Sequence, residues 1–174
     1  MATLSQSLLS LLRGIERGLD KILQPIVFLG MAALIGVITL QIVSRVLFSA
    51  VGWTEEVARF LLVWITFLAG TLAFQRGRHI AVTFAVDALP GRLRQAARVI
   101  ALLIVLAFMI TLIVIGYRYM QVQSFQKSAS LRLSMTYVYA VMPICAAIMA
   151  WYALVDILEL LLNGETSHHQ EEPL

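Results

Sequence analysis

Apolar residues dominate four long stretches of the chain, and polar residues gather between them. Between Lys21 and Arg45 lie 23 residues without a charge, and another 23 lie between Arg132 and Asp156. A helix needs roughly 20 apolar residues to cross a bilayer, because each residue rises about 1.5 Å and the hydrocarbon core is about 30 Å thick. These two stretches therefore predict membrane-spanning helices.

Two further apolar stretches are shorter. Nineteen uncharged residues lie between Arg98 and Arg118, which is enough for a span, but only 16 lie between Arg59 and Arg76. The latter stretch reaches full length if its helix begins near Thr54, so that charged residues occupy its first two turns. The expected spans are about 22–44, 54–75, 99–117 and 133–155.

The segment before the first span has a mixed pattern. Leucine and isoleucine recur at helical spacing on one face, while Arg13, Arg17 and Lys21 recur every fourth residue on another. This pattern is typical of an amphipathic helix in the membrane interface. The apolar region of a secretory signal peptide is only about 7 to 15 residues long. The longer apolar stretch of the first span therefore fits an uncleaved anchor better. The predicted organisation is an interfacial helix over 1–21, a single four-helix transmembrane domain over 22–162 and a disordered cytoplasmic tail over 163–174.

Composition supports the membrane class. The 174 residues are 60% hydrophobic and 13% charged, with a mean hydropathy of +0.88, which is too apolar for an ordinary soluble domain. We therefore predict an all-α integral membrane protein that contacts lipid and no nucleic acid. Eight Lys and Arg residues fall on one side of the predicted spans and five on the other. The positive-inside rule then places both termini in the cytoplasm.

Three of the spans carry pairs of small residues four positions apart, and such pairs let helices approach closely in lipid. The pairs are Ala32 and Gly36, Ala69 and Ala73, and Ala146 and Ala150. The third span is more uniformly aliphatic, so part of it is expected to face lipid.

Ionisable residues are absent from the cores of all four predicted spans. At a helix centre they cost about 2.5 to 3.5 kcal/mol on insertion scales, and they usually mark ion or substrate pathways. Their absence argues against ion-coupled transport by this chain alone. The three histidines, His79, His168 and His169, supply neither a haem ligand inside a span nor the roughly three protein ligands of a zinc centre. We therefore predict no enzymatic activity, no metal and no cofactor.

The densest group of polar residues lies at the start of the second span. Thr54 can cap this helix, and Glu55 and Glu56 suit its positive N-terminal end. Glu55 and Arg59 have the favourable i, i+4 order for an ion pair, and Arg45 is a second possible counter-ion for Glu56. Capping and ion pairing are the expected roles, and contact with a transported ion stays open as the alternative.

Three cations, Arg118, Lys127 and Arg132, lie between the third and fourth spans with no acidic residue among them. The predicted topology places them on the outer side of the membrane. A solvated loop accounts for them, and a docking surface for an acidic extracytoplasmic partner is the alternative.

Short motifs follow one another over residues 45–92. An arginine closes the first span. It is followed by a helix start of the form W-x-E-E-x-A-R and a core of the form V-W-x-x-F-L-x-G. After these come R-x-x-H-I and a later Asp and Leu-Pro. In this sequence they are Arg45, Trp53 to Arg59, Val63 to Gly70, Arg76, His79, Ile80, Asp87, Leu89 and Pro90. This combination resembles the small membrane subunit of tripartite ATP-independent periplasmic (TRAP) transporters, and the resemblance extends to the four-span plan.

The resemblance implies a three-part uptake system in the bacterial inner membrane. A periplasmic binding protein would capture an organic acid such as sialic acid or a C4-dicarboxylate, and a large multi-span membrane subunit would move it with sodium. This chain would then be a scaffold that holds the large subunit and helps to receive the binding protein. The candidate interface residues are Arg45, Trp53, Glu55, Glu56, Arg59, His79 and Asp87. The competing hypothesis is a small transporter or channel assembled from identical four-span subunits.

Overall fold

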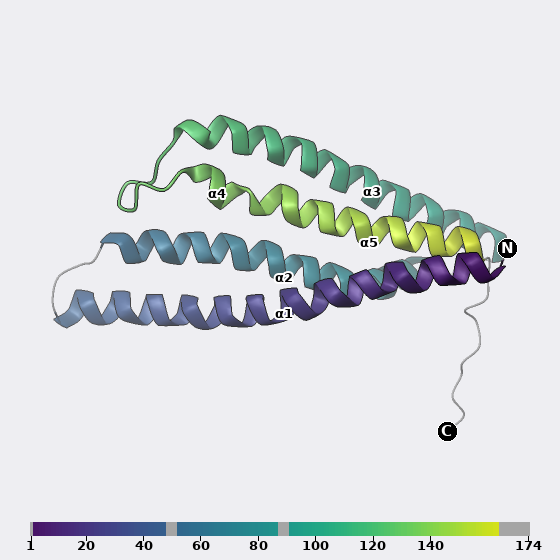
Figure 1. The fold of residues 1–174 in the computed structure, drawn as a ribbon, viewed down its shortest axis with the longest axis horizontal. Helices are drawn as coiled ribbons and strands as arrows, with labels where there is room; N and C mark the ends of the chain where they lie inside the picture. Colours follow the sequence, from purple (N-terminus) through teal and green to yellow (C-terminus); the bar gives the residue numbers. More distant parts are fainter. Residues whose placement is uncertain (1, 48–51, 87–90, 164–174) are drawn as a thin grey trace, which may run out of the picture.

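The structure, a computed structural model, describes residues 2–47, 52–86 and 91–163, and these ranges are almost entirely helical (Figure 1). The elements are α1 (Ala2–Leu47), α2 (Gly52–Val86), α3 (Gly91–Val122), the 3₁₀ helix η1 (Gln123–Phe125), α4 (Met135–Tyr139) and α5 (Val141–Asn163). Within the described ranges, four segments are long and apolar enough to cross a membrane. They are Ser10–Leu47, Gly52–Gly77, Ala96–Phe125 and Met135–Leu160. The prediction of an all-α protein with four spanning helices is confirmed.

Helix formation removes the peptide groups of these segments from lipid without leaving their hydrogen bonds unmade, since each N–H finds a carbonyl in its own helix. Hydroxyl side chains inside the spans use the same carbonyls. Thr66 donates to the carbonyl oxygen of Leu62 at 2.7 Å, and the buried Thr71 donates to that of Phe67 at 2.9 Å. Threonine is therefore accommodated in these apolar helices by the carbonyl groups of its own helix.

The long helices are arranged in the spatial order α1, α2, α5 and α3, which differs from their order in the chain (Figure 1). Helix α5 lies between α2 and α3, and α1 packs mainly against α2. The end of α1, the start of α2 and the loop between η1 and α4 lie at one end of the molecule, here called the loop end. The start of α1, the end of α2, the start of α3 and the end of α5 lie at the other, here called the terminal end.

The apolar core lies where α1, α2 and α5 meet. Its buried members are Leu23, Leu68, Leu72, Val141 and Cys145, and Val27, Val63, Trp64 and Phe67 pack against them. Cys145 is a fully buried free thiol. This side chain thus packs in the core as a small apolar residue.

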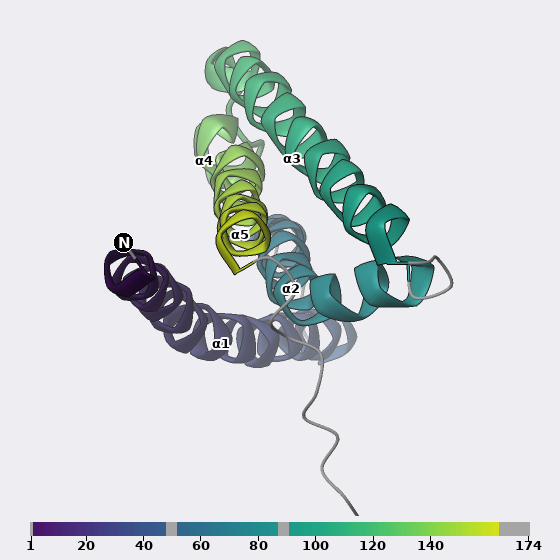
Figure 2. The ribbon, with the colours of Figure 1, turned by 90° about the vertical axis from the view of Figure 1, so that its right-hand side faces the viewer.

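Helix α1 is continuous over 46 residues, about 69 Å at 1.5 Å per residue. No break separates the predicted interfacial helix from the first span. Pro25 lies inside α1, and the helix curves along its length (Figure 2), as expected where a proline removes one backbone hydrogen bond. That residues 1–21 lie along a membrane surface stays a prediction.

The fourth span, predicted as one helix over 133–155, is divided into α4 and α5 at Ala140. Pro143 accounts for the division, because it has no N–H for the carbonyl of Tyr139 and its ring crowds that carbonyl. The hydrogen bond from the Ile144 N–H to the Ala140 carbonyl, at 3.3 Å, restores the helical pattern one residue later.

The three small-residue pairs have different surroundings. Ala146 and Ala150 are buried, whereas Ala32, Gly36 and Ala73 are exposed. The apolar side chains of α3 also lie largely on the surface, as the sequence predicts for a helix that partly faces lipid. They include Ile100, Leu103, Ile104, Phe108 and Ile115.

Gly116 lies at a close contact between α3 and α5. A Cβ atom at this position would lie 3.2 Å from both Cγ and Sδ of Met142 and 3.3 Å from Cδ of Pro143. The helices can pack at this distance only because residue 116 has no side chain. Gly36 on α1 is its counterpart in open surroundings, since a Cβ there would meet nothing within 4 Å.

We expect Gly116→Leu to destabilise the chain by about 1 to 3 kcal/mol, because the added side chain must separate α3 from α5. Gly36→Leu, which makes the same change on an exposed helix face, should leave stability nearly unchanged. Thermal unfolding of the two variants in the same detergent measures the difference. Equal midpoints would contradict the close α3–α5 contact.

Candidate functional site

The loop between η1 and α4, residues 126–134, folds back on itself at the loop end. Lys127 and Ser134 form an antiparallel bridge, and the N–H of Ser128 donates to the carbonyl of Leu133 at 2.8 Å. The hydroxyl oxygen of the buried Ser128 accepts from the N–H of Leu133 at 3.3 Å. Arg132 turns the chain with a φ of 52°, in the left-handed region that non-glycine residues rarely adopt. The loop is therefore an ordered element despite its polar sequence.

Glu56 on α2 holds this loop from the other side. Its carboxylate oxygens accept hydrogen bonds from the backbone N–H groups of Ser130, at 2.7 Å, and Leu131, at 3.0 Å. One turn earlier on α2, Gly52 leaves room for the loop, since a Cβ there would lie 3.3 Å from the Ser130 hydroxyl oxygen. The first turn of α2 and the loop are thus joined by a charge-assisted contact between residues 74 and 75 positions apart in the chain.

The structure separates the two adjacent glutamates. Arg59 donates to Glu55 at 2.9 Å, which confirms the predicted i, i+4 ion pair, and both side chains are exposed. Glu56 binds the loop amides instead, so the predicted pairing of Glu56 with Arg45 is replaced by backbone donors in the described structure. Arg45 is exposed at the end of α1. The sequence contains no signal for the Glu56 contact, because backbone N–H groups belong to every residue.

The start of α2 differs from the prediction in one detail. The helix begins at Gly52, so Thr54 lies inside the first turn and is fully buried, rather than capping the helix. Trp53 is 43% exposed beside it. This geometry places the indole at the edge of the bundle, where tryptophan is typical of a membrane boundary.

The three cations that are candidates for docking are all exposed at the loop end. Lys127 and Arg132 lie on the folded loop, and Arg118 lies on α3. Glu56 accepts from backbone amides of the loop, and the ion pairs of the described residues do not join it to these three side chains. The loop end therefore presents positive charge toward its surroundings.

Two motif residues lie partly or wholly outside the described residues. His79 belongs to α2, but its side chain lies outside the described residues, and Asp87 lies outside them altogether. The tail beyond Asn163 is likewise outside the described range.

A second polar cluster, at the terminal end, was not singled out from the sequence. Arg13 of α1 forms an ion pair with Glu159 of α5. Asp20 of α1 accepts hydrogen bonds from the side-chain amide of Gln75 on α2 and from the hydroxyl group of Tyr152 on α5, the latter at 3.3 Å. Asp20, Gln75 and Tyr152, here called the Asp20 node, tie three helices together.

The acidic residues near the Asp20 node face the protein. Glu16 is only 6% exposed, whereas Leu11, Ile15 and Ile22 lie on the outside of the same segment. The basic residues Arg13, Arg17 and Lys21 are exposed as well, so this segment turns its acidic residues toward the protein and leaves its basic residues outside. The spacing of Arg13, Glu16 and Asp20 on one helix face was the available signal, but it shows a polar stripe without showing what covers it.

The described residues place no group of three or more His, Cys, Asp or Glu side chains where they could hold a metal ion. What the structure does contain is a multi-pass helical membrane protein whose polar contacts gather at its two ends. This is the class that the fold and the site define.

Comparison with known proteins identifies the family. Residues 34–163 match the family model for the DctQ component of tripartite ATP-independent periplasmic transporters. The sialic acid TRAP transporter small permease protein SiaQ of Vibrio cholerae is 31% identical over 140 residues, which cover 79% of this chain and 81% of SiaQ. The chain belongs to the DctQ family of TRAP transporter subunits. It is thus a transporter subunit and not an enzyme, as predicted, and the match extends well beyond the motifs at 45–92.

Two longer relatives are similar over most of this chain but only a part of their own. The isethionate TRAP transporter permease protein DctMQ of Oleidesulfovibrio alaskensis is 31% identical over 143 residues, covering 77% of this chain and 22% of that protein. The sialic acid TRAP transporter permease protein SiaT of Haemophilus influenzae is 28% identical over 118 residues, covering 67% of this chain and 19% of SiaT. In both, a region like this chain is one part of a larger permease polypeptide.

We expect Glu56→Ala to release the loop, because the N–H groups of Ser130 and Leu131 then lose their carboxylate acceptor. Hydrogen exchange of these two amides should accelerate to the rate of unprotected amides. Glu55→Ala is the matched control, since it removes a neighbouring charge that pairs only with Arg59. Equal protection in both variants would contradict the clamp.

Tyr152→Phe should destabilise the chain by about 0.5 to 1.5 kcal/mol, because a buried hydroxyl group that donates to Asp20 is lost. Tyr137→Phe, which removes a hydroxyl group from a side chain that is 71% exposed, should change stability little. Unfolding of both variants in one detergent provides the comparison. An equal effect would show that the Asp20 node contributes nothing measurable.

Proposed function

We propose that this chain is the scaffold subunit of a sodium-coupled, binding-protein-dependent TRAP transporter that imports an organic acid such as sialic acid or a C4-dicarboxylate. In this proposal it lies in the bacterial inner membrane with both termini in the cytoplasm. The scaffold role rests on the kind of side chain found in the centres of the spans. Their central segments hold apolar side chains and hydroxyl groups such as Thr66 and Thr71, which bond to their own helices. Nothing charged is available there to hold a coupling ion.

The partner that performs the transport is a large multi-span membrane subunit. TRAP small permeases partner with large permease subunits, and the composition of DctMQ and SiaT supports this, because the region similar to this chain is about a fifth of each protein. The surface of this chain also suits a helical partner. Apolar side chains cover the outside of α1, and the exposed pair Ala32 and Gly36 lies among them, where another helix could approach closely.

The loop end is the proposed contact for a periplasmic binding protein. Lys127 and Arg132 are displayed by a loop whose backbone is fixed by Glu56, so their positions do not have to be ordered on binding. Arg118, in the last turns of α3 before η1 and this loop, adds a third cation. Exposed cations of this kind raise the association rate with an acidic partner surface and make it dependent on salt.

Reconstitution tests the proposed function. Liposomes that hold this chain with the large subunit should accumulate the organic acid when its binding protein and an inward sodium gradient are supplied. Leaving out this chain, the binding protein or sodium should each abolish uptake. Sodium-driven uptake by this chain alone would overturn the scaffold role in favour of a self-assembling transporter.

In the same system, Glu56→Ala should lower the yield of complex with the large subunit, or the uptake rate, because it frees the loop from α2. His169→Ala, a change near the C-terminus, should leave both unchanged. Normal yield with reduced uptake would locate the role of the loop in contact with the binding protein or the moving subunit. If neither quantity differed between the variants, Glu56 would have no role in assembly or transport.

A further inference from the structure

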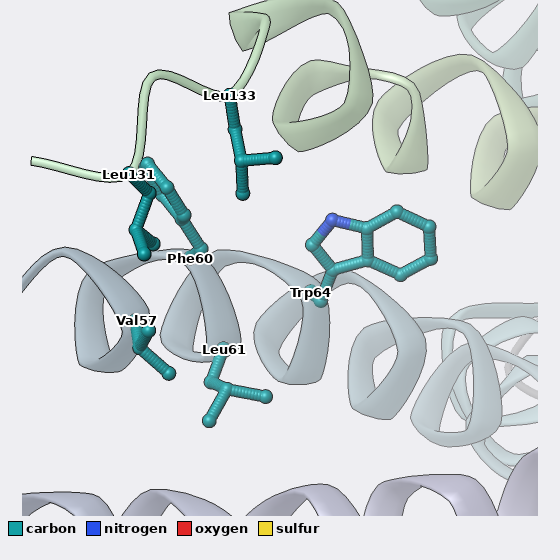
Figure 3. Close-up of a pocket in the computed structure, with 6 residues that line it drawn as sticks. All are labelled: Val57, Phe60, Leu61, Trp64, Leu131 and Leu133. Carbon is teal, nitrogen blue, oxygen red and sulfur yellow. The ribbon is translucent and has the colours of Figure 1, made fainter. Parts of the chain in front are cut away.

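An apolar hollow of about 250 Å³ opens between α2 and the loop at residues 126–134. Phe60 and Trp64 rise from α2 toward the loop, while Leu131 and Leu133 point from the loop toward α2 (Figure 3). Val57 and Leu61 complete the lining. The contact between Glu56 and the loop amides holds the two walls together.

The hollow lies just beneath a layer of charges. Glu55, Glu56 and Arg59 occupy the first two turns of α2, and the lining side chains begin at Val57 and continue one to two turns deeper, to Trp64. In a spanning helix, this depth corresponds to the transition from headgroups to acyl chains. At this depth a lipid acyl chain is therefore the apolar group that can enter the hollow from the bilayer.

The charges beside the hollow favour a negative headgroup. Arg132 lies between the lining residues Leu131 and Leu133, and Lys127 is on the same loop, with both cations exposed. Of the nearby acids, Glu55 pairs with Arg59 and Glu56 accepts from two backbone amides. Three cations, Arg59, Lys127 and Arg132, thus stand against two carboxylates, Glu55 and Glu56, which leaves one positive charge in excess beside the hollow.

We propose that the hollow and its two rim cations bind an anionic phospholipid, with one acyl chain in the hollow and the headgroup phosphate near Lys127 and Arg132. The acyl chain alone gives no preference for this lipid, because leaving the bilayer for an apolar hollow exchanges one apolar surrounding for another. The headgroup supplies the selectivity. This site depends on membrane insertion and not on the proposed transport activity.

Tryptophan fluorescence tests the proposal in the full chain. Trp53→Phe with Trp151→Phe leaves Trp64, in the wall of the hollow, as the only tryptophan. This protein is placed in phosphatidylcholine vesicles with increasing fractions of one brominated lipid. The brominated lipid is phosphatidylglycerol in one series and phosphatidylcholine in the other, and its brominated acyl chains quench nearby indole rings. Brominated phosphatidylglycerol should quench Trp64 at lower mole fractions than brominated phosphatidylcholine.

The rim cations should account for that preference. Lys127→Gln and Arg132→Asn should each reduce it about fivefold, the effect of about 1 kcal/mol per cation at a membrane surface. Asparagine tolerates the left-handed backbone at position 132, and Lys127→Gln tests the same charge effect without changing that position. Arg118→Gln removes a cation from α3, outside the hollow, and should retain the preference.

Three results would overturn the proposal. The first is equal quenching by the two brominated lipids, which would show that Trp64 meets only bulk lipid. The second is a preference that survives both rim variants or that Arg118→Gln abolishes to the same degree. The third is protection of Trp64 from both lipids in the assembled transporter complex, which would assign the hollow to a side chain of the partner subunit.

Discussion

A peptide group inside a bilayer can find a hydrogen-bond partner only within the protein. Most of this structure is a consequence of that constraint: four spanning segments are helical, and threonines in their interiors bond back to their own helices. Polar contacts between helices are then concentrated near the two ends. Glu56 joins α2 to the loop at one end, and Asp20 joins α1 to α2 and α5 at the other.

This division suits a subunit that supports transport without performing it. Central α5 packs against α2 and α3, so the two outer helices, α1 and α3, keep broad apolar faces on the surface. One such face can meet the large permease subunit and the other lipid. The family match places this arrangement in a TRAP transporter, where the coupling ion and the substrate would be held by other subunits.

The loop end shows how one contact can serve several purposes. By accepting from Ser130 and Leu131, Glu56 fixes the loop backbone, and the same fixed backbone displays Lys127 and Arg132 and closes one wall of the apolar hollow. Alanine at position 56 would leave the cations on the loop but remove the contact that holds this loop against α2. The loop is therefore a folded surface element as well as a connection between spans.

The sequence alone determined the class of protein, the number of spans, the Glu55–Arg59 pair and the family, because each depends on spacing within one segment of chain. It could not show that Pro143 divides the fourth span at Ala140, nor which small-residue pair is buried. The partners of Glu56 and of Asp20 were also beyond it, since they lie 74 or more and 55 or more positions away. Only the tertiary structure decided those contacts, because hydrophobic periodicity specifies which face of a helix is apolar but not which neighbour covers it.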